Sequence, residues 1–201
     1  MHLQSVGITG LAGLLLVKGF VMTIKRDLFK FDTPKNKIST RIRFGVWFVF
    51  QHLIFNSSFT PSAFRLHLLK LFGASVGSRV LIRRGVKVHF PWNLEIGDDC
   101  WIGEEVWFIN HEKVLIGSDV CISQRSIICS GGHDYQSVSL EYSHKPVTIK
   151  DGAWVCLDAK VLPGVTIGEC SVVSAGEVVR KSLPDFSMLV GGQIRPIELP
   201  K

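Results

Sequence analysis

The 201-residue sequence is poor in the features that define several large protein classes. It contains only five cysteines, an odd number, and no CxxC pair, which argues against a zinc ribbon or a disulfide framework and favours a reducing compartment such as the cytoplasm. The apolar segment at residues 7–22 is interrupted by Lys18 and is shorter than the ~20 residues of a membrane-spanning helix. It also lacks the basic start and cleavage site of a signal peptide.

Acidic residues are scarce in the first half of the chain. Residues 1–91 contain 14 Lys or Arg and 2 Asp or Glu, a net charge of +12, whereas residues 92–201 contain 9 and 15, a net charge of −6. This asymmetry indicates that one end of the protein faces phosphates or anionic lipid, or that it carries a solvated basic face. We expect no nucleic-acid partner.

Three segments follow one another along the chain. Residues 1–38 are an N-terminal arm, in which residues 1–21 either precede a more ordinary start at Met22 or form a loose apolar helix, and the basic remainder is extended. Residues 39–72 have apolar residues at helical spacing, broken at 56–60, and predict a helical hairpin. The hairpin either caps the main domain or rests on a membrane surface with its aromatic and basic residues.

The ends of these helices have recognisable signals. Ser39 or Thr40 suits an N-cap, Pro61 suits the first turn of the second helix, and Gly73 suits its C-terminal cap.

After Gly73 the apolar residues recur every six positions, a period that fits neither a helix nor a single strand. The residue four positions later is usually small or β-branched, with Glu177 as an exception that we expect near an open end. A hexapeptide β-solenoid explains this pattern, because each six-residue unit forms one face of a triangular coil. The repeating aliphatic positions are Val76, Ile82, Val88, Leu94, Ile96, Ile102, Ile116, Ile122, Ile128, Ile149, Val155, Val161, Ile167, Val173 and Val179.

The period stops between Ile128 and Ile149, which are twenty-one residues apart rather than a multiple of six. A solenoid tolerates insertions at its corners, where the inserted loops tend to carry function. We therefore predict a loop at residues 131–146, and His133 is the catalytic candidate because rigid coils flank it.

The sequences "RRGVKVHFPWNLEIGDDCWIGEEV", "CSGGHDY", "KPVTIKDGAWV" and "VLPGVTIGECSVVSAGEVVRKSLPD" make residues 73–197 resemble the hexapeptide-repeat acetyltransferases. The closest resemblance is to the colanic-acid and exopolysaccharide group, and it includes the hairpin. The resemblance implies an all-β solenoid, a left-handed parallel β-helix with an N-terminal helical hairpin. It also implies a homotrimer that uses acetyl-CoA as co-substrate and needs no metal.

The resemblance also implies roles for individual residues. His133 is the general base; a histidine in water titrates near pH ~6.5 and can accept a sugar hydroxyl proton at neutral pH. Asp134 either orients the ring or contacts the acceptor. The CoA-binding candidates are Trp154, Leu157, Ala175, Lys181 and Arg195. The acceptor candidates are Glu105, Asn110 and His111, with Trp107 able to stack on a sugar or to pack.

Together these features predict an O-acetyltransferase of exopolysaccharide or surface-polysaccharide synthesis, cytoplasmic or peripheral on the inner face of the membrane. The acceptor is a saccharide: free, nucleotide-linked, lipid-linked or polymeric. The alternatives are a non-catalytic hexapeptide scaffold and a zinc carbonic anhydrase using His89, His111, His133 and His144. A different acyl donor, such as succinyl-CoA, stays open, whereas the chain is too short for a solenoid-tailed nucleotidyltransferase.

Overall fold

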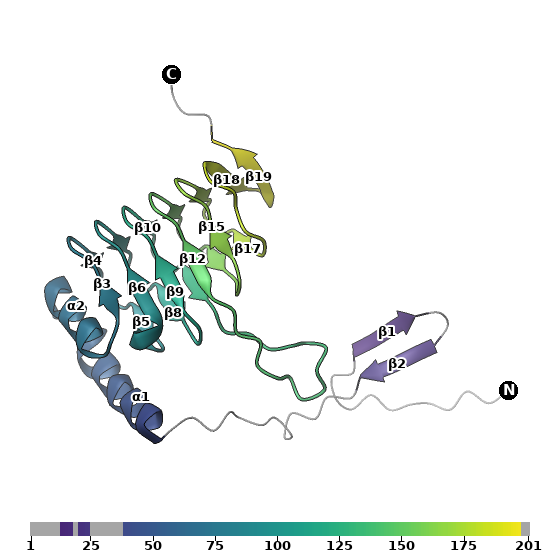
Figure 1. The fold of residues 1–201 in the computed structure, drawn as a ribbon, viewed down its shortest axis with the longest axis horizontal. Helices are drawn as coiled ribbons and strands as arrows, with labels where there is room; N and C mark the ends of the chain where they lie inside the picture. The colour runs from purple at the N-terminus through teal and green to yellow at the C-terminus, as the bar shows by residue number, and fades with distance from the viewer. Residues whose placement is uncertain (1–12, 18–19, 25–37, 198–201) are drawn as a thin grey trace. The chain divides into compact units, whose positions relative to one another are not determined.

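The computed structural model describes residues 13–17, 20–24 and 38–197 (Figure 1). Two strands, β1 (Gly13–Val17) and β2 (Phe20–Ile24), pair in antiparallel fashion. The alternative of a loose apolar helix over residues 1–21 is therefore wrong for residues 13–17, 20 and 21. Residues 23 and 24 are extended as expected, and residues 25–37 of the predicted arm lie outside the described residues. With residues 133–142 these strands belong to one compact unit; residues 38–132 and 143–197 belong to the other.

The helical hairpin has the predicted order. Helix α1 (Ile38–Phe50) continues into one π-helical turn, η2 (Gln51–Phe55), and α2 (Ser62–Leu71) follows after a short turn. Because α1 already includes Ile38, the prediction of Ser39 or Thr40 as N-cap is wrong.

The end of α2 follows the prediction closely. Gly73 adopts a left-handed φ of 91°, its N–H donates to the Lys70 carbonyl, and the Ala74 N–H donates to the Leu69 carbonyl. These two hydrogen bonds form a Schellman cap, for which glycine is favoured because it has no side chain to clash at positive φ.

One face of the hairpin caps the first coil. The Trp47 indole N–H donates to the Val88 carbonyl at 2.7 Å, and Gln51 Oε1 accepts from the Val88 N–H at 2.6 Å. Trp47 packs edge-on against Phe55 and is fully buried, so it is not one of the aromatic residues that could rest on a membrane. Arg65 is also buried and donates to the Phe55 carbonyl at 2.9 Å, and burial lowers its pKa.

The rest of this unit is a parallel β-solenoid whose coils contribute one strand to each of three sheets. Sheet I contains β3 (Ser75–Val76), β6 (Leu94–Ile96), β9 (Val114–Ile116), β12 (Val147–Ile149) and β15 (Thr166–Ile167). Sheet II contains β4 (Leu81–Ile82), β7 (Trp101–Ile102), β10 (Cys121–Ile122), β13 (Trp154–Val155), β16 (Val172–Val173), β18 (Ser187–Val190) and β19 (Gln193–Pro196). Sheet III contains β5 (Lys87–Val88), β8 (Trp107–Ile109), β11 (Ile127–Cys129), β14 (Lys160–Val161) and β17 (Val178–Val179). Only β19 is antiparallel to its neighbour in these sheets.

The six-residue period describes the interior correctly. All fifteen repeating aliphatic side chains are buried, and in register they form ladders such as Ile102, Ile122 and Val155 in sheet II. Parallel sheets need apolar residues on their buried face, and the ladders supply them from every coil. The prediction of a left-handed parallel β-helix with an N-terminal helical hairpin is confirmed.

The coils differ in length at one corner, between sheet III and sheet I. Paired residues of sheet I are 18 positions apart from Thr148 to Thr166 but 20 apart from Ser75 to Glu95. The extra residues include the 3₁₀ turn η3 (Pro91–Asn93) and, further along, the long loop. The same corner therefore holds every insertion in the repeat.

Glu177, the exception to the small fifth position, is half-buried near the last coil. Its Oε1 accepts a hydrogen bond from the Gly192 N–H at 3.1 Å. The carboxylate thus helps to hold the turn between β18 and β19.

Candidate active site

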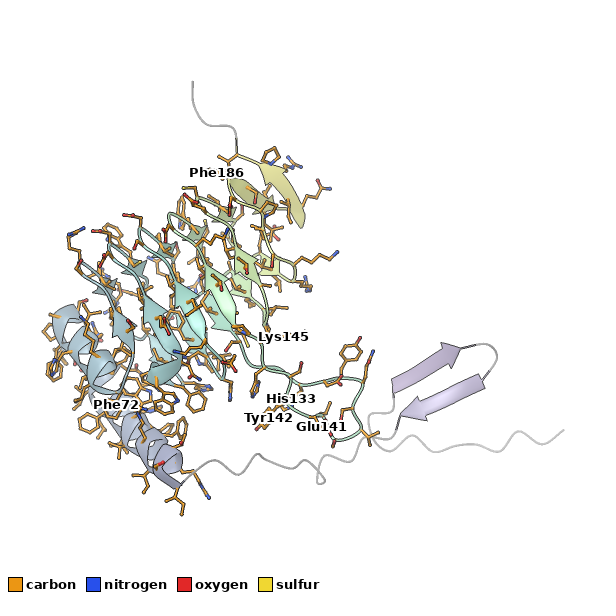
Figure 2. The ribbon with its side chains drawn as sticks, viewed as in Figure 1. Phe72, His133, Glu141, Tyr142, Lys145 and Phe186 are labelled. Atoms are coloured by element: carbon orange, nitrogen blue, oxygen red, sulfur yellow. The ribbon has the colours of Figure 1, made fainter. Side chains whose placement is uncertain are left out.

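The long loop leaves the solenoid at Gly132 and returns at Ser143. The Ser143 N–H donates to the Gly132 carbonyl at 2.8 Å, and the Lys145 N–H donates to the Ser130 carbonyl at 3.0 Å. Within the loop, the ring centroids of His133 and Tyr142 lie 5.0 Å apart. Both residues are labelled in Figure 2. Backbone hydrogen bonds thus join the two ends of the loop predicted at 131–146. Loops of this kind on rigid scaffolds commonly carry functional groups.

His133 is exposed, and its ring is held by the loop's own backbone. Its Nδ1 lies 2.5 Å from the Leu140 carbonyl oxygen. Because a carbonyl only accepts hydrogen bonds, Nδ1 carries the proton when the ring is neutral, and Nε2 carries the lone pair. This tautomer is the one that a general base acting through Nε2 requires.

Asp134 does not orient this ring in the structure. Its Oδ1 accepts from the Gln136 N–H at 2.9 Å, and its own N–H donates to the Glu141 carbonyl at 2.8 Å. The Asp134 carboxylate therefore stabilises a turn of the loop, and the Leu140 carbonyl holds the ring. Of the two roles suggested for Asp134, the acceptor contact stays a prediction.

Three CoA-binding candidates lie on sheet II and at its corner with sheet III. Trp154 on β13 is 48% exposed, and its indole N–H donates to Ser123 Oγ at 2.9 Å, which fixes the ring on the surface. Leu157 and Ala175 are exposed on consecutive coils, joined by the Gly176 N–H donating to the Leu157 carbonyl at 2.8 Å.

The two basic candidates lie near the end of the solenoid. Lys181 follows β17, and Arg195 belongs to the exposed strand β19, where it pairs with Met188 and reaches Gln193 Oε1 at 3.5 Å. Both side chains are exposed, and no contact joins them within residues 38–197. Arg195 is accessible to an anion, but nothing in this one chain brings it to Lys181.

The burial of Asn110 contradicts the prediction that this residue contacts the acceptor. The side chain is fully buried, its Oδ1 accepts from the Phe90 N–H at 3.0 Å, and its Nδ2 donates to the Phe90 carbonyl at 2.6 Å. The amide is thus committed to joining two coils. Glu105, by contrast, is exposed at a coil corner with a positive φ of 60°.

The structure brings together three histidines that the sequence suggested as zinc ligands, of which His111 is also an acceptor candidate. His111 is half-buried between His89, whose ring centroid is 5.4 Å away, and His144, whose ring stacks at 4.8 Å. These histidines come from three successive coils at the corner where the insertions occur. The signal that could have joined them is the two-residue slip of the repeat, which falls at the same corner each time. Among the described residues, no three His, Cys, Asp or Glu side chains gather around a common metal position.

Comparison with known proteins gives the family. The chain is 38% identical over 163 residues to the putative colanic acid biosynthesis acetyltransferase WcaF of Escherichia coli, covering 79% of this chain and 88% of that one. The chain belongs to the hexapeptide-repeat acetyltransferases. It is accordingly an acetyltransferase, and the family that the sequence motifs predicted is confirmed. No family model matches the sequence.

Other relatives and solved structures agree with this family. The Escherichia coli galactoside O-acetyltransferase is 28% identical over 137 residues, covering 66% of this chain and 67% of its own length. A Vibrio cholerae hexapeptide-repeat acetyltransferase, solved with acetyl coenzyme A, has a TM-score of 0.71 at 24% identity, covering 82% and 89% of the two chains. A Clostridium difficile maltose O-acetyltransferase has a TM-score of 0.73 at 23% identity, covering 82% and 91%. These structures share the fold of this hexapeptide-repeat acetyltransferase.

Proposed function

We propose that the protein transfers the acetyl group of acetyl-CoA to a saccharide hydroxyl during the synthesis of an exopolysaccharide or surface polysaccharide. The relative named for colanic acid biosynthesis supports the pathway class, and the relative solved with acetyl coenzyme A supports the donor. The thioester is already activated, so direct attack needs no acyl-enzyme. The hydroxyl oxygen forms the new bond to the acetyl carbon, the carbon–sulfur bond breaks, and the CoA thiolate leaves.

His133 is the general base of this step. The observation that carries the assignment is the hydrogen bond from its Nδ1 to the Leu140 carbonyl, which leaves the lone pair on Nε2. Nε2 takes the hydroxyl proton as the oxygen attacks, and the resulting imidazolium can then protonate the departing thiolate. Protons therefore balance over one turnover without a further group.

Trp154, Leu157 and Ala175 form the surface for the pantetheine arm of CoA, and Lys181 and Arg195 contact its phosphates. The exposed indole of Trp154 offers a flat apolar face, and the exposed basic side chains suit anionic oxygens. Leu157 contributes through its backbone. The acceptor contacts that remain proposed are Glu105 and His111.

The site is completed between subunits of a homotrimer. The His133 loop starts at the corner of sheets III and I, whereas Trp154, Leu157 and Ala175 lie on sheet II and at its corner with sheet III. The start of the loop and the CoA surface therefore lie on different edges of the solenoid. Packing around a three-fold axis would bring one subunit's loop to the next subunit's CoA surface.

The test is acetyl-CoA-dependent release of free thiol over a panel of saccharide acceptors. His133→Ala should lower kcat by ~10²–10⁴-fold, the usual cost of losing a general base, while CoA binding is retained. Trp154→Ala should instead raise the KM for acetyl-CoA. The exposed His67 on α2 gives a matched control, His67→Ala, with unchanged kinetics. Near-normal kcat in His133→Ala would refute the mechanism.

We also propose that the outer face of the hairpin contacts an anionic membrane on its cytoplasmic side. Ile42, Val46, Val49 and Leu53 are between 44% and 72% exposed and follow one helical face, opposite the face that caps the coil. Residues 38–94 contain eight Lys or Arg and no Asp or Glu. A basic segment near lipid gains about 1 kcal/mol per cation. Among the described residues, no helix is long and apolar enough to cross a bilayer.

Co-sedimentation with phosphatidylglycerol vesicles tests the membrane contact. We expect binding at low salt that weakens as salt rises, and loss of binding in the double variant Ile42→Asp, Leu53→Asp. The matched change Ile194→Asp on β19, another exposed apolar residue, should leave binding intact. No binding at low salt, or binding unaffected by salt, would refute an electrostatic contact.

A further inference from the structure

A cavity of about 250 Å³ lies between the hairpin and the outer side of sheet III. It is built from α1 and η2 on one side and from β5, β8 and the residue that follows β5 on the other. The lining residues are Phe44, Trp47, Phe48, Gln51, His52, Lys87, His89 and Trp107. None of them is in the set of predicted catalytic, CoA-binding or acceptor residues, apart from the undecided Trp107.

The cavity has fixed walls. Trp47 donates to the Val88 carbonyl and Gln51 accepts from the Val88 N–H, so the two side chains bond both backbone groups of one residue, and both are buried. Hydrogen bonds therefore hold α1 and η2 against β5 directly beside the cavity. A gap held open by hydrogen bonds on its own lining residues is a preformed site rather than loose packing.

One polar atom of the lining has no partner. The Nδ1 of His89 is buried and makes no hydrogen bond to any described residue. The ring stands edge-on to Trp107 at 6.0 Å and to His111 at 5.4 Å. Burial lowers the pKa of His89, which keeps the ring neutral at pH 7 with one donor and one acceptor. Buried polar atoms usually have a partner; because Nδ1 is closed off in this conformation, a ligand hydroxyl would reach it after a turn of the ring.

The remaining lining indicates the chemistry of the ligand. Phe44, Phe48 and Trp107 provide ring faces, on which the C–H face of a sugar can lie. Lys87 lies 5.5 Å from the Trp107 ring centre, and no carboxylate of the described chain is within ion-pair distance of it. The volume is below the ~300–1,000 Å³ of pockets for drug-sized ligands, which favours one ring over a longer chain.

The position of the cavity connects it to the loop. His89, His111 and His144 form a continuous row of rings along the corner, and His144 Nδ1 accepts from the Gly132 N–H at 3.2 Å. Gly132 is the residue before His133. The row therefore runs from the cavity to the point where the loop begins.

We propose that this cavity is a saccharide-binding subsite that takes one anionic sugar ring of the acceptor, with its carboxylate or phosphate beside Lys87 and one hydroxyl on His89. This inference rests on the proposed function and extends it to the acceptor. The ring stacks on Trp107, and the neighbouring part of the acceptor follows the histidine row toward the loop. The ring bound here is a specificity-determining unit and is not itself required to carry the acetylated hydroxyl.

The test uses two sugars of matched shape, glucuronate and glucose, and follows binding to the purified protein by calorimetry. We expect glucuronate to bind more tightly than glucose. Lys87→Gln should weaken glucuronate binding about tenfold, the effect of losing one charge-assisted contact, and leave glucose binding unchanged. Glucose 1-phosphate in place of glucuronate distinguishes a phosphate preference from a carboxylate preference, and either result supports the anionic subsite.

Lys160→Gln is the matched control, because Lys160 has the same outward position on β14 of sheet III, in register through Ile127 with Trp107. It should leave binding of both sugars unchanged. Trp107→Ala should weaken both sugars, and thermal unfolding checks that each variant is folded. Absence of binding by every sugar, or equal losses in Lys87→Gln and Lys160→Gln, would overturn the proposal. The proposed function is tested separately by thiol release in His133→Ala, so the two failures are distinguishable.

Discussion

Replacing Asn110 by alanine should destabilise the protein rather than weaken acceptor binding. The fully buried amide is the hydrogen-bond acceptor for the Phe90 N–H, whereas the Phe90 carbonyl keeps a second donor, the Asn93 N–H at 2.9 Å. Asn110→Ala therefore leaves one backbone N–H unsatisfied, at a cost of about 1–3 kcal/mol, and adds the cost of a small void. We expect a total loss of about 2–4 kcal/mol in the free energy of unfolding.

Denaturant unfolding of the variant, together with acceptor kinetics, measures this effect. Glu105→Gln is the matched comparison, because Glu105 is an acceptor candidate that is exposed. It should leave unfolding unchanged and alter only the KM for the acceptor. If Asn110→Ala keeps wild-type stability and raises that KM, then Asn110 binds the acceptor and the reading of its geometry is wrong.

Two further predictions concern the coils. Gly168→Ala should cost about 1–3 kcal/mol of stability, because an added Cβ would lie 2.3 Å from the backbone of Pro184. Gly45→Ala, where an added Cβ would have no atom within 4 Å, should instead stabilise α1 by about 0.5–1 kcal/mol. Equal effects of the two substitutions in urea unfolding would contradict this reasoning. Hydrogen bonds from the Ser78 N–H and hydroxyl lower the pKa of Asp98, so its contribution is present above the unfolded pKa of ~4 and is lost as the pH falls through the folded pKa. Thermal unfolding from pH 7 to 3 should therefore show a smaller acid loss in Asp98→Asn than in the wild type.

The solenoid could be predicted from sequence because its rule is local. Every sixth residue must be a buried aliphatic, and this requirement is visible in a single chain without reference to distant contacts. The two strands β1 and β2 escaped prediction because an apolar run of this length suits a strand as well as a helix.

The site was harder to predict because its residues depend on contacts that the repeat does not encode. The loop was located by the broken period, but the partner of the His133 ring is a backbone carbonyl, which no side-chain pattern reveals. Asn110 occupies a position where a polar residue could equally serve a ligand or a neighbouring coil. Only its two bonds to Phe90 decide between these roles.

The measurement that tests the central claim most directly is activity in mixed oligomers. His133→Ala and Trp154→Ala subunits are unfolded together, mixed in equal amounts and refolded. The assay uses acetyl-CoA at a concentration near the wild-type KM, where the raised KM of Trp154→Ala leaves that parent impaired. If the base of one subunit serves the CoA surface of the next, about one quarter of the interfaces contain both native residues, and thiol release should recover to about that fraction of the wild type. A mixture no more active than its parents, or a fully active monomer, would contradict the account.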